Sequence, residues 1–179
     1  MKNVILTKLY KAPCGVLTLG SVGDRLCLCD WPAERHRSLV QRRLETALGA
    51  SFADGTSELI EQAALELDEY FAGHRRTFDV PLLLAGTDFQ KTVWTELLNI
   101  PYGQTASYAE LARRIGRPEA VRAVANAVGA NALSVFIPCH RVVGSGRSLT
   151  GYAGGLEAKR ALLTLECDNK FDLEGVERL

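Results

Sequence analysis

Residues 138–141 read Pro-Cys-His-Arg and interrupt an apolar run that extends from Val135 to Val143. Proline removes a backbone donor and restricts the residue before it, so regular strand pairing must break at this point. Side chains of neighbouring residues in a regular strand point to opposite faces. At such a break, Cys139 and His140 could instead meet directly or through a water molecule.

A cysteine beside a histidine is a common arrangement for nucleophilic chemistry. The imidazole can accept the thiol proton, and the resulting cation stabilises the thiolate. The alternative is that Cys139 is an inert small hydrophobic residue, which is the usual state of a buried cysteine. The spacing alone leaves both readings open. We apply the inert reading to the remaining cysteines: Cys14, Cys27, Cys29 and Cys167.

The N-terminal part of the chain predicts a small β-meander followed by two helices. Three alternating apolar runs, at 4–10, 16–22 and 25–31, are separated by Gly and Pro. Helical periodicity follows at about 33–48 and 57–72, where the second stretch has an apolar stripe opposite its acids. Residues 74–86 lack a clear period, which predicts a linker or an edge strand between two units.

The second unit is predicted to be mainly helical. Thr87 with Gln90 and Ser107 with Glu110 have the spacing of capping boxes, which start helices. A short helix ending at Gly116 and another over about 118–129 make a helix-turn-helix. The second helix has a valine stripe for the core, and its opposite face carries one long cation among small or short side chains: Arg122, Ala125, Asn126 and Gly129.

Composition excludes several classes of protein and leaves nucleic acid open as a partner. The start of the chain has no signal-peptide pattern, and no run reaches the roughly 20 apolar residues of a membrane span. The odd number of cysteines argues for free thiols in the cytoplasm, and the histidines have no zinc-ligand spacing. The net charge is zero, but residues 101–160 carry eight bases and three acids. A basic surface is what phosphate binding requires, although a merely solvated surface explains the same charges.

Four motifs together resemble the methylated-DNA–protein-cysteine methyltransferase family, of the bacterial type. They are YGQTASYAELA (102–112), RPEAVRAVANA (117–127), ANALSVFIPCHRVV (130–143) and GYAGGLEAK (151–159). The resemblance is strong over about 87–166. It implies an α/β N-terminal domain, ribonuclease-H-like, with a small β-meander and helices over 1–82. A mainly α, winged helix-turn-helix-like domain would follow over 83–168, with a tail over 169–179.

The resemblance also implies a reaction and its residues. Cys139 would accept the alkyl group of O6-alkylguanine in DNA, with possible activity on O4-alkylthymine, and would be consumed once per lesion. His140 would be the base and Glu166 would orient it, while Tyr108 would donate to the purine and Asn131 would brace the active-site loop. The alkyl and guanine pocket would include Tyr108, Val142, Tyr152, Ala153 and Ser134, where Ser134 replaces a proline of some members.

The implied partner is double- or single-stranded DNA that carries the lesion, bound by a monomer without metal or cofactor. Because the lesion is inaccessible in a duplex, the nucleotide must be flipped out, and Arg122 would fill the gap. The expected DNA-contacting residues are Arg122, Ser107, Ala123, Ala125, Asn126, Gly129 and Arg141. Two other classes stay open: a helix-turn-helix regulator or lesion binder without transfer, and a Cys-His hydrolase.

Overall fold

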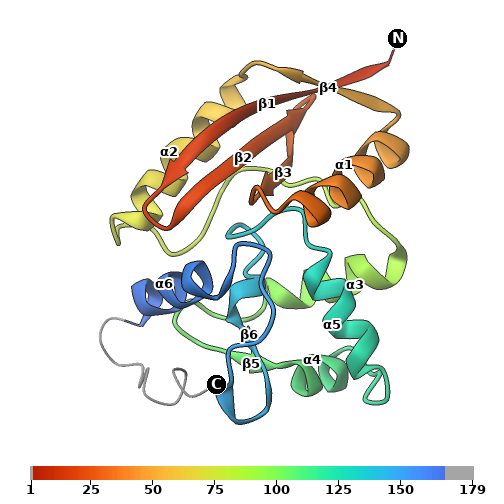
Figure 1. Cartoon of the computed structure of the whole chain (residues 1–179), viewed down its shortest axis with the longest axis vertical. Helices are drawn as coiled ribbons and strands as arrows, with labels where there is room; N and C mark the ends of the chain where they lie inside the picture. Colours follow the sequence, from red (N-terminus) through yellow and green to blue (C-terminus); the bar gives the residue numbers. More distant parts are fainter. Residues whose placement is uncertain (1, 168–179) are drawn as a thin grey trace. The chain divides into compact units, whose positions relative to one another are not determined.

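The chain forms two compact units, the first ending at Gly86 and the second beginning at Thr87 (Figure 1). The structure is a computed structural model, and it describes residues 2–167. The tail expected over 169–179 lies outside the described residues. Each unit has its own core, so each is described by itself.

A four-stranded sheet forms the centre of the first unit. β1 (Asn3–Ala12), β2 (Gly15–Val22) and β3 (Arg25–Asp30) are the antiparallel meander expected from the alternating runs. A fourth strand, β4 (Ala50–Asp54), pairs with β1 in parallel, so the order is β3-β2-β1-β4. The sequence ASFAD is short and only weakly alternating, and therefore gave no strand signal of its own.

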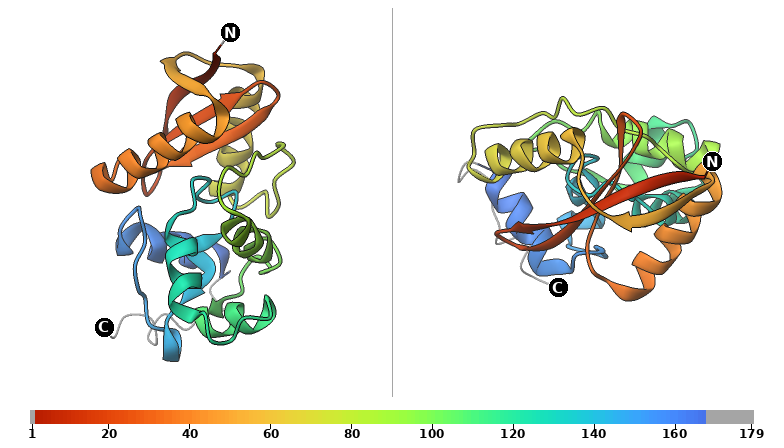
Figure 2. Two further views of the ribbon diagram at one scale, coloured as in Figure 1. Left: turned by 90° about the vertical axis from the view of Figure 1, so that its right-hand side faces the viewer. Right: turned by 90° about the horizontal axis from the view of Figure 1, so that it is seen from above.

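Helices α1 (Glu34–Leu48) and α2 (Glu58–Phe71) cover opposite faces of this sheet (Figure 2). The Ser57 hydroxyl, which caps α2, lies 2.8 Å from that of Ser21 in β2. On the other face, Val40 of α1 lines a small space with Thr18 and Leu28. The alternation of β2 and β3 therefore buries side chains on both faces, as expected for a sheet packed between helices.

The segment between the two units forms one β-bridge with the edge of the sheet, between Leu82 and Leu26 of β3. The Leu26 amide donates to the Pro81 carbonyl at 2.9 Å, and the Leu83 amide donates to the Leu26 carbonyl at 2.8 Å. Glu66 of α2 anchors this segment, because its carboxylate accepts the amides of Asp79 and Val80 at 3.0 and 3.3 Å. Glu66 is buried, so the expectation that the acids of α2 all lie on its outer face is wrong.

The second unit is mainly helical, with a two-stranded parallel ladder. It contains α3 (Asp88–Leu97), β5 (Ala106–Ser107), α4 (Tyr108–Arg114) and α5 (Val121–Gly129). A 3₁₀ turn η1 (Cys139–Arg141), β6 (Val142–Val143), a second turn η2 (Ser145–Arg147) and α6 (Leu156–Glu166) follow. Both predicted capping boxes are present, at the starts of α3 and α4.

The helix-turn-helix is formed by α4 and α5, with a later start of α5 than expected. Gly116 ends α4 with φ of 74°, and Pro118 lies in a turn instead of the first helical turn. Helix α5 begins only at Val121, which is 36% exposed, so its core stripe consists of Val124, Ala127 and Val128. The Trp94 indole of α3 donates to the Ala127 carbonyl at 2.8 Å and fixes α3 against α5.

The apolar run before Pro138 is not a strand. Residues 135 and 136 form a turn, in which the Ile137 amide donates to the Leu133 carbonyl at 2.8 Å. Val135 has φ of 73°, a conformation that is costly for a β-branched residue. The run is apolar because it is buried and not because it pairs, so periodicity could not distinguish the two cases.

Candidate functional site

Cys139 is the first residue of η1, immediately after the proline that breaks the chain direction. Pro138 has φ of −79° and ψ of 62°, and the Cys139 amide donates back to the Ile137 carbonyl at 2.7 Å. The Arg141 amide closes the turn on the Pro138 carbonyl at 3.0 Å. Cys139 is 7% exposed, so the turn holds this residue almost fully buried.

Asn131 braces the segment that leads into this turn. Its side-chain amide donates to the Ile137 carbonyl at 3.0 Å, and its oxygen accepts the Leu133 amide at 2.9 Å. Asn131 is 2% exposed and lies just after α5. A buried Asn with both ends bonded to backbone fixes the geometry of a loop, because breaking either bond leaves a buried polar group unsatisfied.

His140 and Glu166 are in direct contact inside the second unit. His140 Nε2 and Glu166 Oε1 are 2.8 Å apart, and both side chains are at most 1% exposed. An ionised carboxylate only accepts, so Nε2 carries the hydrogen and, in a neutral ring, Nδ1 keeps its lone pair. Nδ1 is buried and has no hydrogen-bond partner among the described residues. The neutral ring therefore keeps a basic nitrogen that no described residue occupies.

Arg141 holds the same carboxylate from another side. Its Nε donates to Glu166 Oε2 and its Nη2 to Oε1, each at 2.8 Å. Nη1 donates to the Ile100 carbonyl at 2.6 Å, and the guanidinium lies 5.7 Å from the centre of the Tyr102 ring. The expectation that Arg141 contacts DNA is thus corrected: the residue is 6% exposed, and its Nε, Nη1 and Nη2 all donate to groups inside the protein.

The charges of the cluster follow from these contacts. Burial raises the pKa of Glu166, but His140 and Arg141 overcome this and hold the pKa well below its usual value. For His140, burial lowers the pKa and outweighs the attraction of Glu166. The carboxylate is therefore ionised and matched by Arg141, while the imidazole is neutral at rest.

The β5–β6 ladder brings the start of α4 beside the acceptor segment. Ala106 pairs with Val142 and Ser107 with Val143, and Tyr108 follows directly as the first residue of α4. Val142 is fully buried, while Tyr108 is partly exposed. The geometry therefore brings Tyr108, the expected donor to the purine, and Val142, an expected pocket residue, to the same ladder.

The remaining pocket residues lie in two loops. Tyr152 and Ala153 precede α6 and are partly exposed. Ser134 precedes the Val135 turn and is 1% exposed, and its buried hydroxyl has no hydrogen-bond partner within residues 2–167. Ser134 is thus an interior residue of the acceptor segment.

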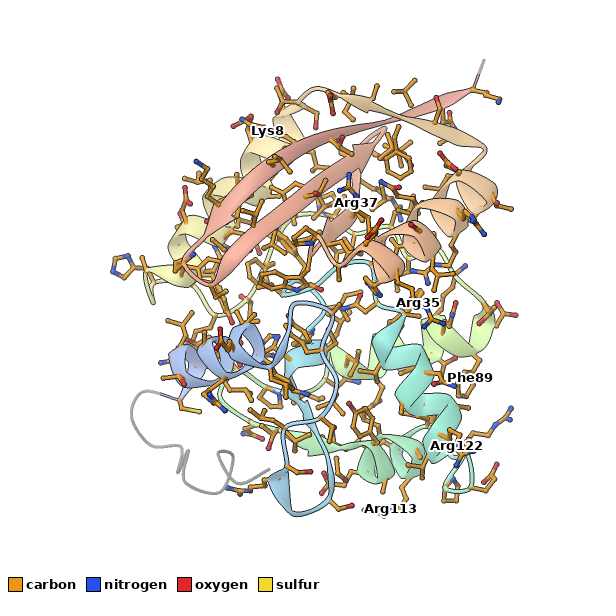
Figure 3. All side chains as sticks on the ribbon, viewed as in Figure 1. Lys8, Arg35, Arg37, Phe89, Arg113 and Arg122 are labelled. Carbon is orange, nitrogen blue, oxygen red and sulfur yellow. The ribbon has the colours of Figure 1, made fainter. Side chains whose placement is uncertain are left out.

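The predicted DNA-contacting face of α5 is exposed. Arg122 extends outward from this helix in Figure 3, and Arg113 is labelled on α4. Ala123, Asn126 and Gly129 are exposed, whereas Ala125 is partly covered. Ser107 is only half-buried, but its hydroxyl caps α4 by accepting the Glu110 amide at 3.1 Å.

Lys159 is a polar residue of this region that the sequence did not single out. It is fully buried on α6, and its ammonium donates to the Thr150 carbonyl at 2.8 Å. The buried face of α6 consists of Ala158, Lys159, Leu162, Leu163 and Glu166. Lys159 and Glu166 both lie on this otherwise apolar stripe. A charged residue at a core position of a helix is the sequence signal that could have identified Lys159.

Within residues 2–167, no group of three or more His, Cys, Asp or Glu side chains is arranged to hold a metal ion. No helix in the described part of the chain has the length and apolar character to cross a membrane.

Two family models match the chain, one for each unit. The model described as "6-O-methylguanine DNA methyltransferase, ribonuclease-like domain" matches residues 5–84. The one described as "6-O-methylguanine DNA methyltransferase, DNA binding domain" matches residues 88–167. The two matches meet in the same stretch as the two compact units of the structure.

Similar proteins support the same relationship. A methylated-DNA–protein-cysteine methyltransferase of Haemophilus influenzae is 40% identical over 88% of this chain and 83% of its own length. One of Mycobacterium tuberculosis is 56% identical over 101 residues, which span 56% of this chain and 61% of that relative. The aligned part thus spans less than two thirds of the mycobacterial protein.

Solved structures resemble most of the chain. A crystal structure of Mycobacterium tuberculosis O6-methylguanine methyltransferase has a TM-score of 0.74 and 40% identity, and covers 92% of this chain and 93% of its own. A structure of the mycobacterial protein in complex with DNA has the same TM-score, with 42% identity over 92% of each chain.

Proposed function

Because this chain belongs to the methylated-DNA–protein-cysteine methyltransferase family, we propose that it repairs DNA by direct reversal. It transfers the alkyl group from O6 of guanine to the sulfur of Cys139 and is consumed in the reaction. The observation that carries this proposal is the buried contact between His140 and Glu166 directly after Cys139, since the thiol of Cys139 then precedes a base that is oriented by a carboxylate.

The proposed transfer begins with formation of the Cys139 thiolate. His140 Nδ1 is the unoccupied acceptor of a neutral ring whose other nitrogen is held by Glu166, so it can take the thiol proton directly or through water. The thiolate attacks the alkyl carbon in line with the O6 bond. The sulfur–carbon bond forms, the carbon–oxygen bond breaks, and guanine leaves with the electron pair and gains a proton.

The leaving guanine needs donors that relieve the charge on O6. Tyr108 lies at the start of α4, beside the ladder that carries Val142. We assign the Tyr108 hydroxyl to the purine and the Val142 carbonyl to the exocyclic amine. A preorganised donor in a site that excludes water is worth far more than the same donor in water. Tyr152, Ala153 and Ser134 would complete the alkyl side of the pocket.

We propose that α5 docks on DNA through its small exposed face. Arg122 is the long side chain on a surface otherwise formed by Ala123, Asn126 and Gly129, so the helix can approach a groove closely while one cation enters it. Extrusion of a nucleotide costs a few kcal/mol, and a side chain that occupies the gap offsets part of that cost. No base need be read, which suits a protein that searches for lesions in any sequence.

The proposed substrate is O6-alkylguanine in double- or single-stranded DNA, acted on by a monomer in the cytoplasm. The cysteines of the described part are free thiols, and a reducing compartment would keep the acceptor among them active. O4-alkylthymine is a second substrate of the same chemistry, because it also presents an alkyl carbon on an exocyclic oxygen.

The test uses an oligonucleotide with a radiolabelled methyl group on O6 of one guanine. The protein should take up label to at most one equivalent, on the peptide that contains Cys139. Cys139→Ser should take up none and still bind the oligonucleotide, since the phosphate and groove contacts lie on other residues. Label on Cys139→Ser, or release of label with turnover as in a hydrolase, would overturn the proposal. Binding without any label would leave only a lesion-binding or regulatory role.

A further inference from the structure

Two residues other than glycine adopt a positive φ within residues 2–167, and both lie in the second unit. One is Val135, in the turn before the acceptor, and the other is Arg147, with φ of 62°. A residue with a Cβ is destabilised in this conformation, whereas glycine adopts it readily. Such strain is concentrated at functional sites, where the surrounding structure enforces it. The arginine at position 147 therefore calls for an explanation beyond the fold itself.

Arg147 is the last residue of η2, a tight turn that is closed by two backbone hydrogen bonds. The Gly144 amide donates to the Ser148 carbonyl at 2.8 Å, and the Arg147 amide donates to the Gly144 carbonyl at 3.1 Å. Gly146, the residue before Arg147, also has a positive φ, of 68°. Successive residues with positive φ are typical of tight turns in which glycine and asparagine are favoured. Glycine would thus suit position 147 better than arginine as far as the backbone is concerned.

The base of this turn is fixed to the core of the second unit. Val143 directly precedes the turn and Leu149 directly follows it, and both form a buried cluster with Leu163 of α6. Each of the three is at most 3% exposed, whereas residues 145–147 at the tip are exposed. The fold therefore holds Arg147 at the tip of a short projection whose two ends are anchored.

The turn lies next to the start of the helix-turn-helix. Strands β5 and β6 are parallel, so the segments that follow them leave the ladder at the same end. Ser107 of β5 leads into α4, and its partner Val143 of β6 leads into η2. Figure 1 and the left view of Figure 2 both show this turn at the same end of the unit as α4. Residues 143–149 include no acid, so the turn itself contributes one positive charge beside the expected DNA-contacting surface.

We propose that Arg147 binds a phosphate of the DNA backbone, so that the η2 turn is a second docking element beside α5. This inference rests on the proposed docking of the helix-turn-helix on DNA and extends it. A guanidinium matches a phosphate through two parallel N–H donors, which glycine lacks. A phosphate contact carries no sequence information but fixes the register of the protein on the duplex. Arg147 thus positions the protein on DNA, and this role retains an arginine where the backbone favours glycine.

Three substitutions separate the charge of Arg147 from its backbone conformation. Arg147→Gln keeps a long side chain and the Cβ but removes the charge, and Arg147→Lys keeps both the Cβ and a cation. Arg147→Gly removes the guanidinium and also relieves the strain, so the variant should fold. Arg25→Gln is the matched control, because Arg25 is an exposed cation at the start of β3 in the first unit.

The first measurement is the affinity for an undamaged, fluorescein-labelled duplex, followed by anisotropy from about 50 to about 200 mM salt. Loss of one phosphate contact should lower the slope of log K against log salt by about 0.9 in Arg147→Gln and in Arg147→Gly. Their binding should weaken roughly five- to tenfold at about 0.1 M salt. Arg147→Lys should keep the slope, and Arg25→Gln should match the wild type. A wild-type slope in Arg147→Gln would overturn the proposal.

The second measurement is the melting temperature without DNA. Arg147→Gly and Arg147→Gln both lack the guanidinium, so the difference between them reports the cost of a Cβ at positive φ. The glycine variant should melt about 2–4 °C higher than the glutamine variant. A residue with a merely structural role would not combine higher stability with weaker DNA binding when replaced by glycine. Equal melting temperatures would show that the turn accepts a side chain without strain, which would overturn the inference that DNA binding retains the arginine.

Failure of this inference is distinguishable from failure of the proposed function. A wild-type protein that binds no duplex at any of these salt concentrations would contradict DNA docking itself. Normal binding by the wild type, with equal affinity and salt dependence in Arg147→Gln, would leave docking through α5 intact and would overturn the contact at Arg147 alone. Because the duplex carries no lesion, neither outcome depends on transfer of an alkyl group to Cys139.

Discussion

Arg141 and Glu166 form an ion pair with two parallel hydrogen bonds, from Nε to Oε2 and from Nη2 to Oε1, each 2.8 Å long. The pair joins the acceptor turn to α6, since Arg141 is the last residue of η1 and Glu166 is the last residue of α6. Arg141 supplies the positive charge that the buried Glu166 carboxylate requires. His140 can therefore bond to a carboxylate and still remain a neutral base.

Arg141→Met should destabilise the protein strongly, because it leaves the buried Glu166 carboxylate without its cation. Breaking one partner of such a buried pair costs on the order of 3–5 kcal/mol. We expect His140 to take up a proton in response and to lose its role as a base. Urea unfolding measures the first effect, and NMR titration of the histidine ring measures the second. Arg113→Met is the control, an exposed cation on α4 that should change stability by less than about 0.5 kcal/mol.

Glu166→Gln should slow alkyl transfer more than it weakens DNA binding. Glutamine can hydrogen-bond to His140 but no longer enforces the tautomer with Nδ1 free, and in a related catalytic geometry this change cost about 10⁴ in rate. We expect a loss of at least about a hundredfold in the single-turnover rate constant. Affinity for an undamaged oligonucleotide should stay within about twofold. A transfer rate equal to that of the wild type would remove Glu166 from the proton relay.

The fold was largely predictable from local patterns. The three strands, both helices of the first unit and the two capping boxes follow from alternation, helical period and Ser or Thr at fixed spacing. Strand β4 and the bridge between Leu82 and Leu26 of β3 have no such signal, because their pairing partners are distant in the chain. Long-range pairing depends on the folded sheet, so the five residues of a short strand carry little local sequence pattern that predicts it.

The site was less predictable because its geometry depends on contacts between distant residues. The proline marks the break at Cys139, but the turn at Val135 and the burial of Arg141 depend on packing against α6 and Ile100. A basic residue in a basic segment reads as a phosphate ligand until the structure shows a carboxylate beside it. Lys159 is the opposite case, a cation whose position on an apolar stripe indicates a buried role.

Asn131→Ala should loosen the acceptor turn. The substitution leaves the Ile137 carbonyl and the Leu133 amide without their partner in a buried segment, at a cost of about 2 kcal/mol or more. Hydrogen exchange of the amides from Leu133 to Cys139 should speed up, and the transfer rate should fall with it. Asn99→Ala is the control, since Asn99 is exposed just after α3 and lies outside the proposed DNA-contacting face. A stable variant with unchanged hydrogen exchange would mean that the turn at Val135 keeps its conformation without Asn131.

Stability should fall as the pH is lowered below about 6.5, and the slope should steepen again below about 4.5. The folded state lowers the pKa of His140 from 6.5 and of Glu166 from 4.5, so the unfolded chain binds more protons in these two ranges. Each group therefore stabilises the fold above its unfolded pKa, and this contribution is lost toward acid. Urea unfolding between pH 7 and pH 5 measures the first step. His140→Gln should abolish it, and a persistent step in that variant would assign it to another group.

Arg122→Ala should slow repair of duplex DNA much more than repair of single strands. Arg122 is exposed on α5 and, in the proposed complex, fills the space left by the flipped nucleotide. Single-stranded DNA has no opposite base to separate, so the cost of extrusion that Arg122 offsets is small there. If Arg122 only neutralised one phosphate, its removal would weaken both complexes and lower the salt dependence of both by a similar amount.

The measurement compares single-turnover transfer rates on a labelled oligonucleotide, alone and annealed to its complement, at saturating protein. Arg122→Ala should lose at least about tenfold on the duplex and less than about threefold on the single strand, in keeping with an extrusion cost of a few kcal/mol. Arg113→Ala supplies the matched control, because it removes an exposed cation from the neighbouring helix α4. A mismatch opposite the lesion should restore part of the rate to Arg122→Ala, since a mispaired base is already cheaper to extrude. Equal losses on duplex and single strand would show that Arg122 contributes charge and not extrusion.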